Sequence, residues 1–302
     1  MGAVFLGRDT RGGRAVAIKT LALSQEFQSD QFEAARERFF HEAKTAGRLK
    51  HDDIVAVYEV GEDGDVAYIA MEYVHGQDLV PYTHRQRLLP VPTVLRIMVR
   101  VTRALAYAHS QGVVHRDIKP ANVMVDLHTA AVKVTDFGIA SIADNSRTRT
   151  GVVIGTPSFM SPEQLAGHPA DGRSDLYAAG VMLFQLLTGR LPHQADSMAG
   201  LMHRIAHEPA DDVRTLRPEL PEALANVVML ALQKRPEMRY ANGEQMATDL
   251  TAVDGLMTLM ANAAAAAQAA ASTPQPQGLP SAETPGSGGR SSGEARHNSE
   301  AP

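Results

Sequence analysis

The sequence predicts an α+β fold, in which strands with one helix come first and a mainly helical second half follows, as one large domain or as two lobes. Strand-like runs rich in Val, Ile and Ala occupy residues 1–74, together with one long helical pattern. Helical patterns dominate residues 75–254. From residue 255 onward Ala, Pro, Gly and Ser prevail and aromatic residues are absent, so residues 255–302 are predicted to form a disordered tail.

Composition and charge narrow the classes of protein. The chain has 302 residues, of which 44% are hydrophobic, enough for a sizeable core. Its 29 Lys and Arg against 34 Asp and Glu give a net charge of −5, so we expect no nucleic-acid partner. The chain has no Cys, which excludes disulfides, thiolate metal sites and a cysteine nucleophile.

Neither a signal peptide nor a membrane span is expected, and the predicted location is the cytoplasm. Met1 leads directly into strand-like sequence. Residues 255–272 form the most apolar run, but it is mostly alanine and carries Asn262 and Gln268. We interpret this run as a helix extension or a linker.

In the first lobe, residues 3–9 and 14–21 are predicted strands joined by a glycine-containing hairpin turn. Residues 28–50 form a helical pattern with one apolar face, made by Phe32, Ala35, Phe39, Ala43 and Ala46. Residues 54–60 and 66–71 are two more predicted strands, again joined by a turn with two glycines.

The second lobe is predicted to be helical over residues 92–111, 174–189, 201–207, 221–232 and 243–254. Gly112 is expected to end the first of these helices. The second is apolar on nearly every side, so it must be buried all round, with Gly189 closing it.

The polar stretch with the clearest chemistry lies between β-branched runs at residues 113–125. It holds Asp117, Lys119 and Asn122 within six residues. A polar loop fixed between two strand-like flanks can place several side chains in one small volume, as proton-transfer chemistry requires. Asp136, Phe137 and Gly138 follow another strand-like run.

These two stretches resemble the H-R-D-x-x-x-x-N catalytic loop and the D-F-G motif of protein kinases. Lys119, two residues after the acid, resembles the serine/threonine branch, and the chain as a whole looks like a bacterial, eukaryotic-like serine/threonine protein kinase. The resemblance covers about residues 2–254. It implies a two-lobed protein-kinase-like fold, with a small lobe at 1–74 and a large lobe at 75–254. It also implies ATP with Mg²⁺, or Mn²⁺ in its place, and proteins bearing Ser or Thr as substrates.

The resemblance implies a role for each polar residue of the site. Asp117 would accept or orient the substrate hydroxyl proton, Lys119 would lie beside the γ-phosphate, and Asn122 and Asp136 would hold the metal ion. The other implied nucleotide-binding residues are Lys19 with its partner Glu42, the hinge residues Glu72 and Val74, and Gly2, Val4, Ala17 and Met124. Taken alone, Lys19 would be an ordinary strand-end lysine and Glu42 a solvated glutamate.

Residues 154–163 resemble the end of a kinase activation segment, with Ser161 where the family usually has Ala. The resemblance implies that Glu163 pairs with Arg239 and that Asp175 braces the catalytic loop. Thr148 and Thr150, among arginines, are candidate phosphorylation sites that would order this segment, and self-association would allow one copy to phosphorylate another. The alternative is a simple flexible loop rich in Ser and Thr.

The glycine-rich loop departs from the family pattern G-x-G-x-x-G-x-V, because Gly2 stands at the third glycine and Val4 at the valine. The strand at 3–9 is therefore expected to be an exposed edge, and nucleotide affinity should fall. We favour a true start upstream of Met1. The alternatives are a weak kinase or pseudokinase scaffold and, less favoured, a small-molecule phosphotransferase of related fold.

Overall fold

The computed structural model of the chain describes residues 3–22, 32–64, 66–137 and 157–271. Contacts divide the chain into two units, Met1–Met260 and Ala261–Pro302. The first unit contains both predicted lobes.

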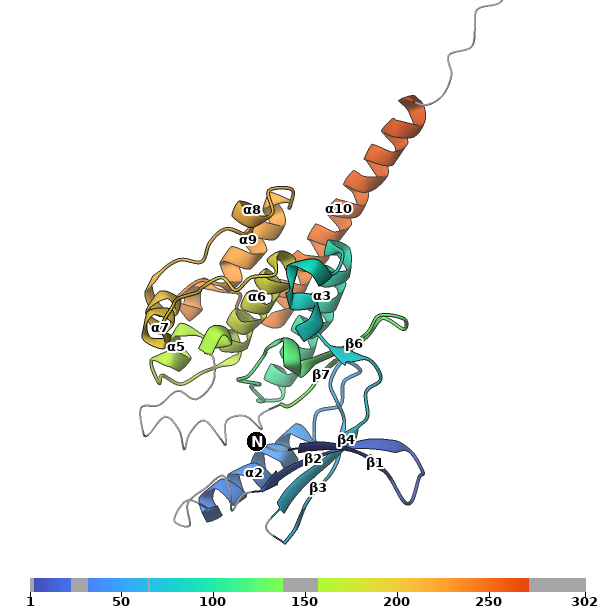
Figure 1. Ribbon diagram of the computed structural model, residues 1–302, viewed down its shortest axis with the longest axis vertical. Coiled ribbons are helices and arrows are strands. Elements are labelled where there is room, and N and C mark those ends of the chain that lie inside the picture. Colours follow the sequence, from blue (N-terminus) through green and yellow to red (C-terminus); the bar gives the residue numbers. More distant parts are fainter. Residues whose placement is uncertain (1–2, 23–31, 65, 138–156, 272–302) are drawn as a thin grey trace, which may run out of the picture. The chain divides into compact units, whose positions relative to one another are not determined.

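The small lobe is a four-stranded antiparallel sheet in the order β1-β2-β4-β3 (Figure 1). Its strands are β1 (Ala3–Arg8), β2 (Ala15–Ala22), β3 (Val57–Asp63) and β4 (Val66–Glu72). The β1 strand lies at an edge, and its Val4, Phe5 and Leu6 are 61%, 56% and 69% exposed. The expectation of an exposed edge strand is confirmed.

One helix, α2 (Phe32–Ala46), accompanies this sheet. It buries Ala35, Phe39 and Ala43 in one cluster with Ala67 and Ile69 of β4, as the apolar spacing predicted. The prediction ran to residue 50, but α2 ends at Ala46. Here the chain tightens into i→i−3 hydrogen bonds, from Arg48 N to Thr45 O (3.2 Å) and from Leu49 N to Ala46 O (3.0 Å).

The start of β3 differs from the prediction for a physical reason. Ile54 and Val55, which the pattern joined to this strand, pair instead with β7 (Ala131–Val134) of the large lobe. Val55 N donates to Val134 O (3.0 Å), and Val134 N donates to Asp53 O (2.8 Å). The two lobes therefore share backbone hydrogen bonds beside the site.

The connection after β4 passes very close to another strand. Gly76 has a φ of 112°, and a Cβ at this position would lie 2.2 Å from Val125 O. Only glycine fits both the backbone angle and the space. The next residues form the short strand β5 (Gln77–Asp78), which pairs with β6 (Val123–Asp126).

Replacing Gly76 by Ala should therefore lower the free energy of unfolding by more than about 2 kcal/mol. Gly13→Ala is the matched control, because Gly13 also has a positive φ (68°) but nothing within 4 Å of an added Cβ. The control should cost only about 1 kcal/mol. Urea unfolding of both variants checks the difference, and equal losses would contradict the close approach.

The large lobe is built around α6 (Gly172–Thr188), which packs against α3 (Val91–Ser110) and α9 (Glu222–Ala231) (Figure 1). Leu176, Leu183 and Phe184 of α6 are at most 1% exposed, and Gly189 ends the helix with a φ of 73°. The prediction of a helix buried all round is confirmed. Gly112, with a φ of 75°, likewise follows the end of α3.

Shorter elements complete the large lobe. They are η1 (Val80–Thr83), η2 (Arg85–Arg87), η3 (Pro120–Asn122), η4 (Pro157–Phe159), α5 (Pro162–Leu165), α7 (Met198–His207), α8 (Val213–Leu216) and η5 (Pro236–Met238). The large lobe also contains a three-stranded sheet in the order β5-β6-β7. Its strand β7 pairs through Val134 with Ile54, which precedes β3 of the small sheet.

The last helix, α10 (Gly243–Ala271), is longer than predicted. It was expected to end at residue 254 and to give way to a disordered tail, but residues 255–271 are helical. An alanine-rich run has the highest intrinsic helix propensity, which accounts for the difference. The interpretation of this run as a helix extension is confirmed, and its assignment to the tail is wrong. The rest of the predicted tail lies outside the described residues.

Among the residues that the structure describes, one helical stretch, Pro236–Gln268, could cross a membrane by length and composition alone. Its most apolar window has a mean hydropathy of 1.3, and 11% of that window is buried. A single stretch of this kind is weak evidence, because core helices of globular proteins pass the same criterion. It establishes no membrane span.

Candidate functional site

The β6–β7 hairpin brings two predicted metal ligands together. Val123 of β6 pairs with Val134 of β7, and Thr135 N donates to Asn122 O (2.9 Å). Asn122 precedes one strand and Asp136 follows the other, so both lie at the open end of the hairpin. Antiparallel pairing thus brings Asn122 and Asp136 close together, although thirteen residues lie between them in the sequence.

A lysine from the small lobe reaches the same point. Lys19, on β2, donates from Nζ to Asp136 Oδ1 at 2.7 Å, and the two side chains are 27% and 24% exposed. Asp136 has a φ of 63°, a left-handed backbone that only a well-supported site sustains in a residue other than glycine. Glu42 lies on α2 next to the buried Ala43 and is itself half-buried. Its predicted pairing with Lys19 stays a prediction.

Asp117 is the centre of the predicted catalytic loop. Asn122 Nδ2 donates to Asp117 O (2.7 Å) and to Asp117 Oδ2 (3.0 Å). Lys119 Nζ lies 2.7 Å from the same Oδ2. Because these contacts are made by Oδ2, Oδ1 is the oxygen that we expect to meet a hydroxyl donor.

A buried carboxylate from α6 holds the backbone of this loop. Asp175, 1% exposed, accepts hydrogen bonds from His115 N (2.8 Å) and Arg116 N (2.7 Å). It also contacts His109 Nε2 at 2.8 Å. Arg116 has a φ of 68°, so the two bonds to Asp175 fix a strained turn directly before Asp117. The predicted bracing contact is confirmed.

His115 connects the loop to the hairpin. It is fully buried; Asp117 N donates to its Nδ1 (3.3 Å), and its Nε2 lies 2.8 Å from Thr135 O. Nδ1 therefore accepts, and the ring proton is on Nε2, which donates to the carbonyl. This one side chain ties the position of Asp117 to the residue before Asp136.

The predicted pair of Glu163 and Arg239 is also confirmed. Arg239 Nη1 and Nη2 donate to Glu163 Oε1 (2.7 Å) and Oε2 (2.8 Å), and Ser174 Oγ donates to Oε1 (2.6 Å). Burial would raise the pKa of Glu163, but the hydrogen bonds from Arg239 and Ser174 outweigh it and hold this pKa below its ordinary value. The pair joins α5 to the loop before α10.

The segment between the lobes begins at Glu72, the last residue of β4. Its Oε2 accepts from Lys133 Nζ (2.8 Å) and from Ala56 N (3.2 Å). The Glu72 side chain is therefore held against the large lobe, while the predicted adenine contacts of Glu72 and Val74 concern backbone groups. Ala17 pairs with Met71 across the β2–β4 register. Contacts of Val4, Ala17 and Met124 with a nucleotide stay predictions.

Two residues that contact Glu72 and Asp175, namely Lys133 and His109, were not predicted from the sequence. Lys133 gave a signal, since alternation in β7 places it on the opposite face from the buried Val132 and Val134. His109 gave none, because a histidine near the end of an amphipathic helix has many ordinary roles. Four predicted residues, Gly2, Gly138, Thr148 and Thr150, lie outside the described part of the chain.

The donor set fits a hard divalent cation. Asn122 commits its amide nitrogen to Asp117, which leaves the amide oxygen as a ligand, and Asp136 offers a carboxylate. Within the described ranges, no group of three or more His, Asp or Glu could hold a metal ion alone. Two oxygen ligands suit Mg²⁺, which usually takes one or two protein ligands together with phosphate oxygens and water.

Comparison with known proteins agrees with this geometry. Residues 1–250 match the model of the protein kinase domain. The chain is 39% identical over 256 residues to the serine/threonine-protein kinase PrkC of Bacillus subtilis, covering 84% of this chain and 39% of the relative. It is 42% identical over 266 residues to the serine/threonine-protein kinase pkn3 of Myxococcus xanthus, covering 84% and 48%. The chain thus spans less than half the length of these curated relatives.

A solved structure shows the same fold. The crystal structure of Rad53 1-466 in complex with AMP-PNP superposes with a TM-score of 0.68, covering 82% of this chain and 60% of that chain at 21% identity. The two-lobed fold predicted from the sequence, a small antiparallel sheet followed by a helical lobe, is therefore confirmed.

Proposed function

The chain belongs to the protein kinase domain family, and on that premise we propose that it is a serine/threonine protein kinase that transfers the γ-phosphoryl group of ATP to protein hydroxyls. One observation carries the proposal. Lys19, Asp117, Asn122 and Asp136, which come from both lobes, are linked by contacts of 2.7–3.0 Å and by the Asn122–Thr135 backbone bond.

Phosphoryl transfer needs aligned reactants and positive charge where negative charge develops, rather than covalent help. Asp117 orients the hydroxyl and accepts its proton. Lys119 supplies a point charge, and it can leave Asp117 for the γ-phosphate because the lysine side chain is 38% exposed. Lys19 leaves Asp136 for the α- and β-phosphates. Asn122 and Asp136 would hold a divalent metal ion, which would supply positive charge to the triphosphate.

The proposal also covers the metal ion, the location, the substrates and the regulation of the enzyme. Mg²⁺ is favoured over Mn²⁺ as the abundant hard cation, and ATP and Mg²⁺ are supplied in the cytoplasm, where we place this unit. Substrates are proteins with exposed Ser or Thr. Phosphorylation of Thr148 and Thr150 by a second copy would order the activation segment and place an anion near Arg116.

Two alternatives differ from this proposal in what they predict. A pseudokinase scaffold would bind nucleotide without transfer. A small-molecule phosphotransferase would not need the buried Glu163–Arg239 pair or the brace from Asp175, so these contacts support a protein kinase.

The purified chain, given γ-labelled ATP and Mg²⁺, should label a basic test protein in proportion to time and enzyme, and should label small alcohols far more slowly. Lys19→Met is the negative control. Saturable nucleotide binding with no label on any acceptor would support the scaffold, and label on small alcohols alone would support the second alternative.

A further inference from the structure

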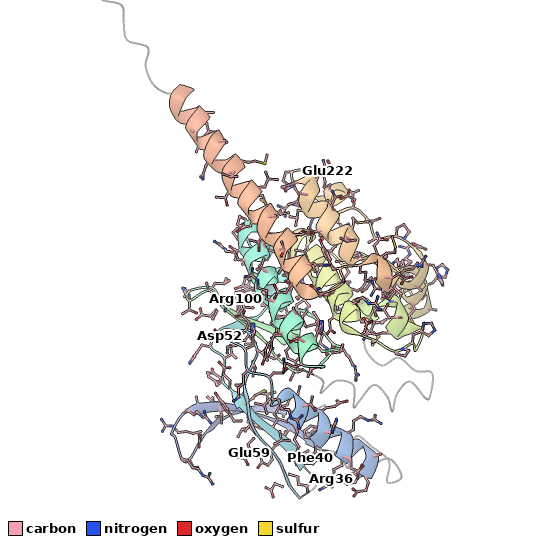
Figure 2. All side chains as sticks on the ribbon, turned by 180° about the vertical axis from the view of Figure 1, so that it is seen from behind. Arg36, Phe40, Asp52, Glu59, Arg100 and Glu222 are labelled. Carbon is pink, nitrogen blue, oxygen red and sulfur yellow. The ribbon has the colours of Figure 1, made fainter. Side chains whose placement is uncertain are left out.

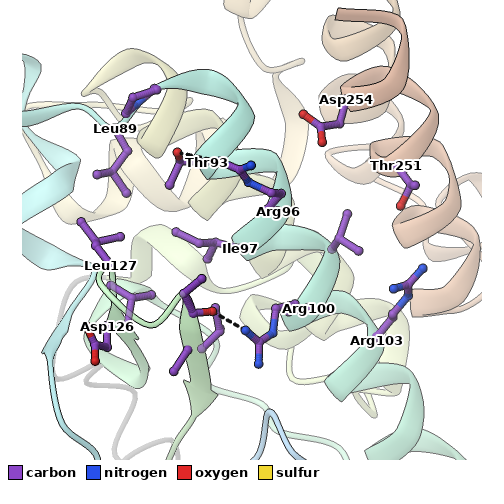
Figure 3. A pocket seen from close by; sticks show the side chains of 16 residues that line it. Leu89, Thr93, Arg96, Ile97, Arg100, Arg103, Asp126, Leu127, Thr251 and Asp254 are labelled. Atoms are coloured by element: carbon purple, nitrogen blue, oxygen red, sulfur yellow. Dashed lines mark hydrogen bonds between the residues drawn. The ribbon is translucent and has the colours of Figure 1, made fainter. Parts of the chain in front are cut away.

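A cavity lies on the large lobe, and neither Lys19 nor Asp117 lines it. Its volume is about 650 Å³, within the 300–1,000 Å³ usual for small-molecule sites. Figure 3 shows its three walls: α3, the β6–β7 hairpin with its turn, and α10 at Thr251 and Asp254. Apolar side chains dominate the lining, among them Leu89, Ile97, Leu127 and Val132.

Most charged side chains around this cavity already have partners within the protein. Arg100 donates from Nε to Asp53 Oδ1 (2.8 Å), and its other nitrogens contact Asp53 and Ala130 O. Asp126 accepts from His128 N (2.9 Å) and Thr129 Oγ1 (2.8 Å), and these bonds, led by the backbone one, lower its pKa. Both side chains are therefore committed to intramolecular contacts rather than to a ligand.

Two arginines of α3 remain, and their surroundings differ. Arg103 has Glu244 within 4.0 Å and shares the α10 side of the cavity with Asp254, so an anion there would meet carboxylates. Arg96 donates from Nη2 to a neutral hydroxyl, Thr93 Oγ1, at 3.3 Å. Arg96 is thus the guanidinium whose charge the described contacts leave uncompensated, and it stands beside the apolar wall (Figure 3).

We propose that this cavity binds one amphiphilic anion, an aliphatic chain with a carboxylate or phosphate head. The aliphatic chain of the ligand would pack against Ile97, Leu127 and Val132. Its anionic head would form a bidentate pair with the guanidinium of Arg96. Walls on three sides favour a compact ligand over an extended peptide. The inference does not depend on the proposed kinase activity, although the ligand would touch the turn of the hairpin whose open end carries Asn122 and Asp136.

Equilibrium dialysis of the whole chain against radiolabelled dodecanoate, kept below its micelle concentration, tests the proposal. We expect about one molecule bound per chain, and AMP-PNP with Mg²⁺ should not displace it. Leu127→Asp and Arg96→Glu should each weaken binding about tenfold or more. Leu127 is 44% exposed, so Leu127→Asp should keep the wild-type Tm.

Matched controls outside the cavity are Leu230→Asp, at a leucine 37% exposed on α9, and Arg214→Glu, on α8. Both should bind dodecanoate as the wild type does. Equal binding by all variants, displacement by nucleotide, or many molecules bound per chain would overturn the proposal. So would association only with phosphatidylglycerol vesicles, which would assign the anion to a membrane surface, or binding only of acidic peptides.

Discussion

Replacing Asp117 by Asn should lower kcat for phosphoryl transfer by about a hundredfold to ten-thousandfold and leave nucleotide affinity nearly unchanged. The amide has the same shape, so Asn122 Nδ2 can still donate to its oxygen and to the backbone carbonyl. What is lost is the carboxylate that we propose as the acceptor of the hydroxyl proton, together with its pairing with Lys119. The loss should therefore appear in kcat rather than in binding.

Asp52→Asn is the control for this experiment, since Asp52 is an exposed carboxylate outside the site (Figure 2). Steady-state rates and nucleotide titrations of the two variants separate chemistry from binding. An Asp117→Asn chain with wild-type kcat, or one whose only defect is weaker nucleotide binding, would contradict the role given to this residue.

Replacing Arg239 by Ala should lower the free energy of unfolding by about 3–5 kcal/mol, the largest stability effect that we expect. The Arg239 side chain is fully buried and Glu163 is 9% exposed. Besides its two bonds to Glu163, the guanidinium donates to Gln233 O (2.7 Å) and Lys234 O (2.9 Å). It also lies 4.9 Å from the centroid of the Tyr177 ring. Alanine leaves Glu163 as a buried charge without its partner.

Arg235→Ala is the matched control, four residues away. Arg235 pairs with Glu237 at the surface and is 75% exposed, so its loss should cost less than about 1 kcal/mol. Urea unfolding at neutral pH measures both variants. Similar losses would contradict the account of Arg239 as the buried anchor of α5.

The same pair predicts a pH dependence. The pKa of Glu163 is lower in the folded chain than its ordinary value of 4.5, so its ionised form stabilises the fold. That contribution is complete above pH 4.5 and is lost as the pH falls through the lowered pKa. Glu163→Gln should remove this part of the acid sensitivity, which unfolding curves between neutral and acid pH would show.

Local patterns predicted the elements whose formation depends on their own residues. The apolar run of α6 and the glycines after α3 and α6 specify burial and termination directly, and both were found. The motifs around Asp117 and Asp136 likewise pointed to residues that the fold brings together, since Asn122 contacts Asp117 and Lys19 contacts Asp136.

Features that depend on distant partners could not be predicted in the same way. Ile54 and Val55 have strand-like sequence, but only the folded chain shows that they pair with β7 rather than β4. The tie between Glu72 and Lys133 joins positions 61 residues apart. The length of α10 did not follow from the pattern, because residues 255–271 lack aromatic residues, whereas the high helix propensity of alanine continues the helix.

The central claim is that Asp117 aligns a protein hydroxyl with a nucleotide held by Lys19, Asn122 and Asp136. The most direct test is a single-turnover reaction with γ-labelled ATP and Mg²⁺, followed by identification of the labelled amino acid. We predict label on Ser and Thr with the wild type, and almost none with Asp117→Asn. Label on Tyr alone, or equal labelling by both chains, would contradict the claim.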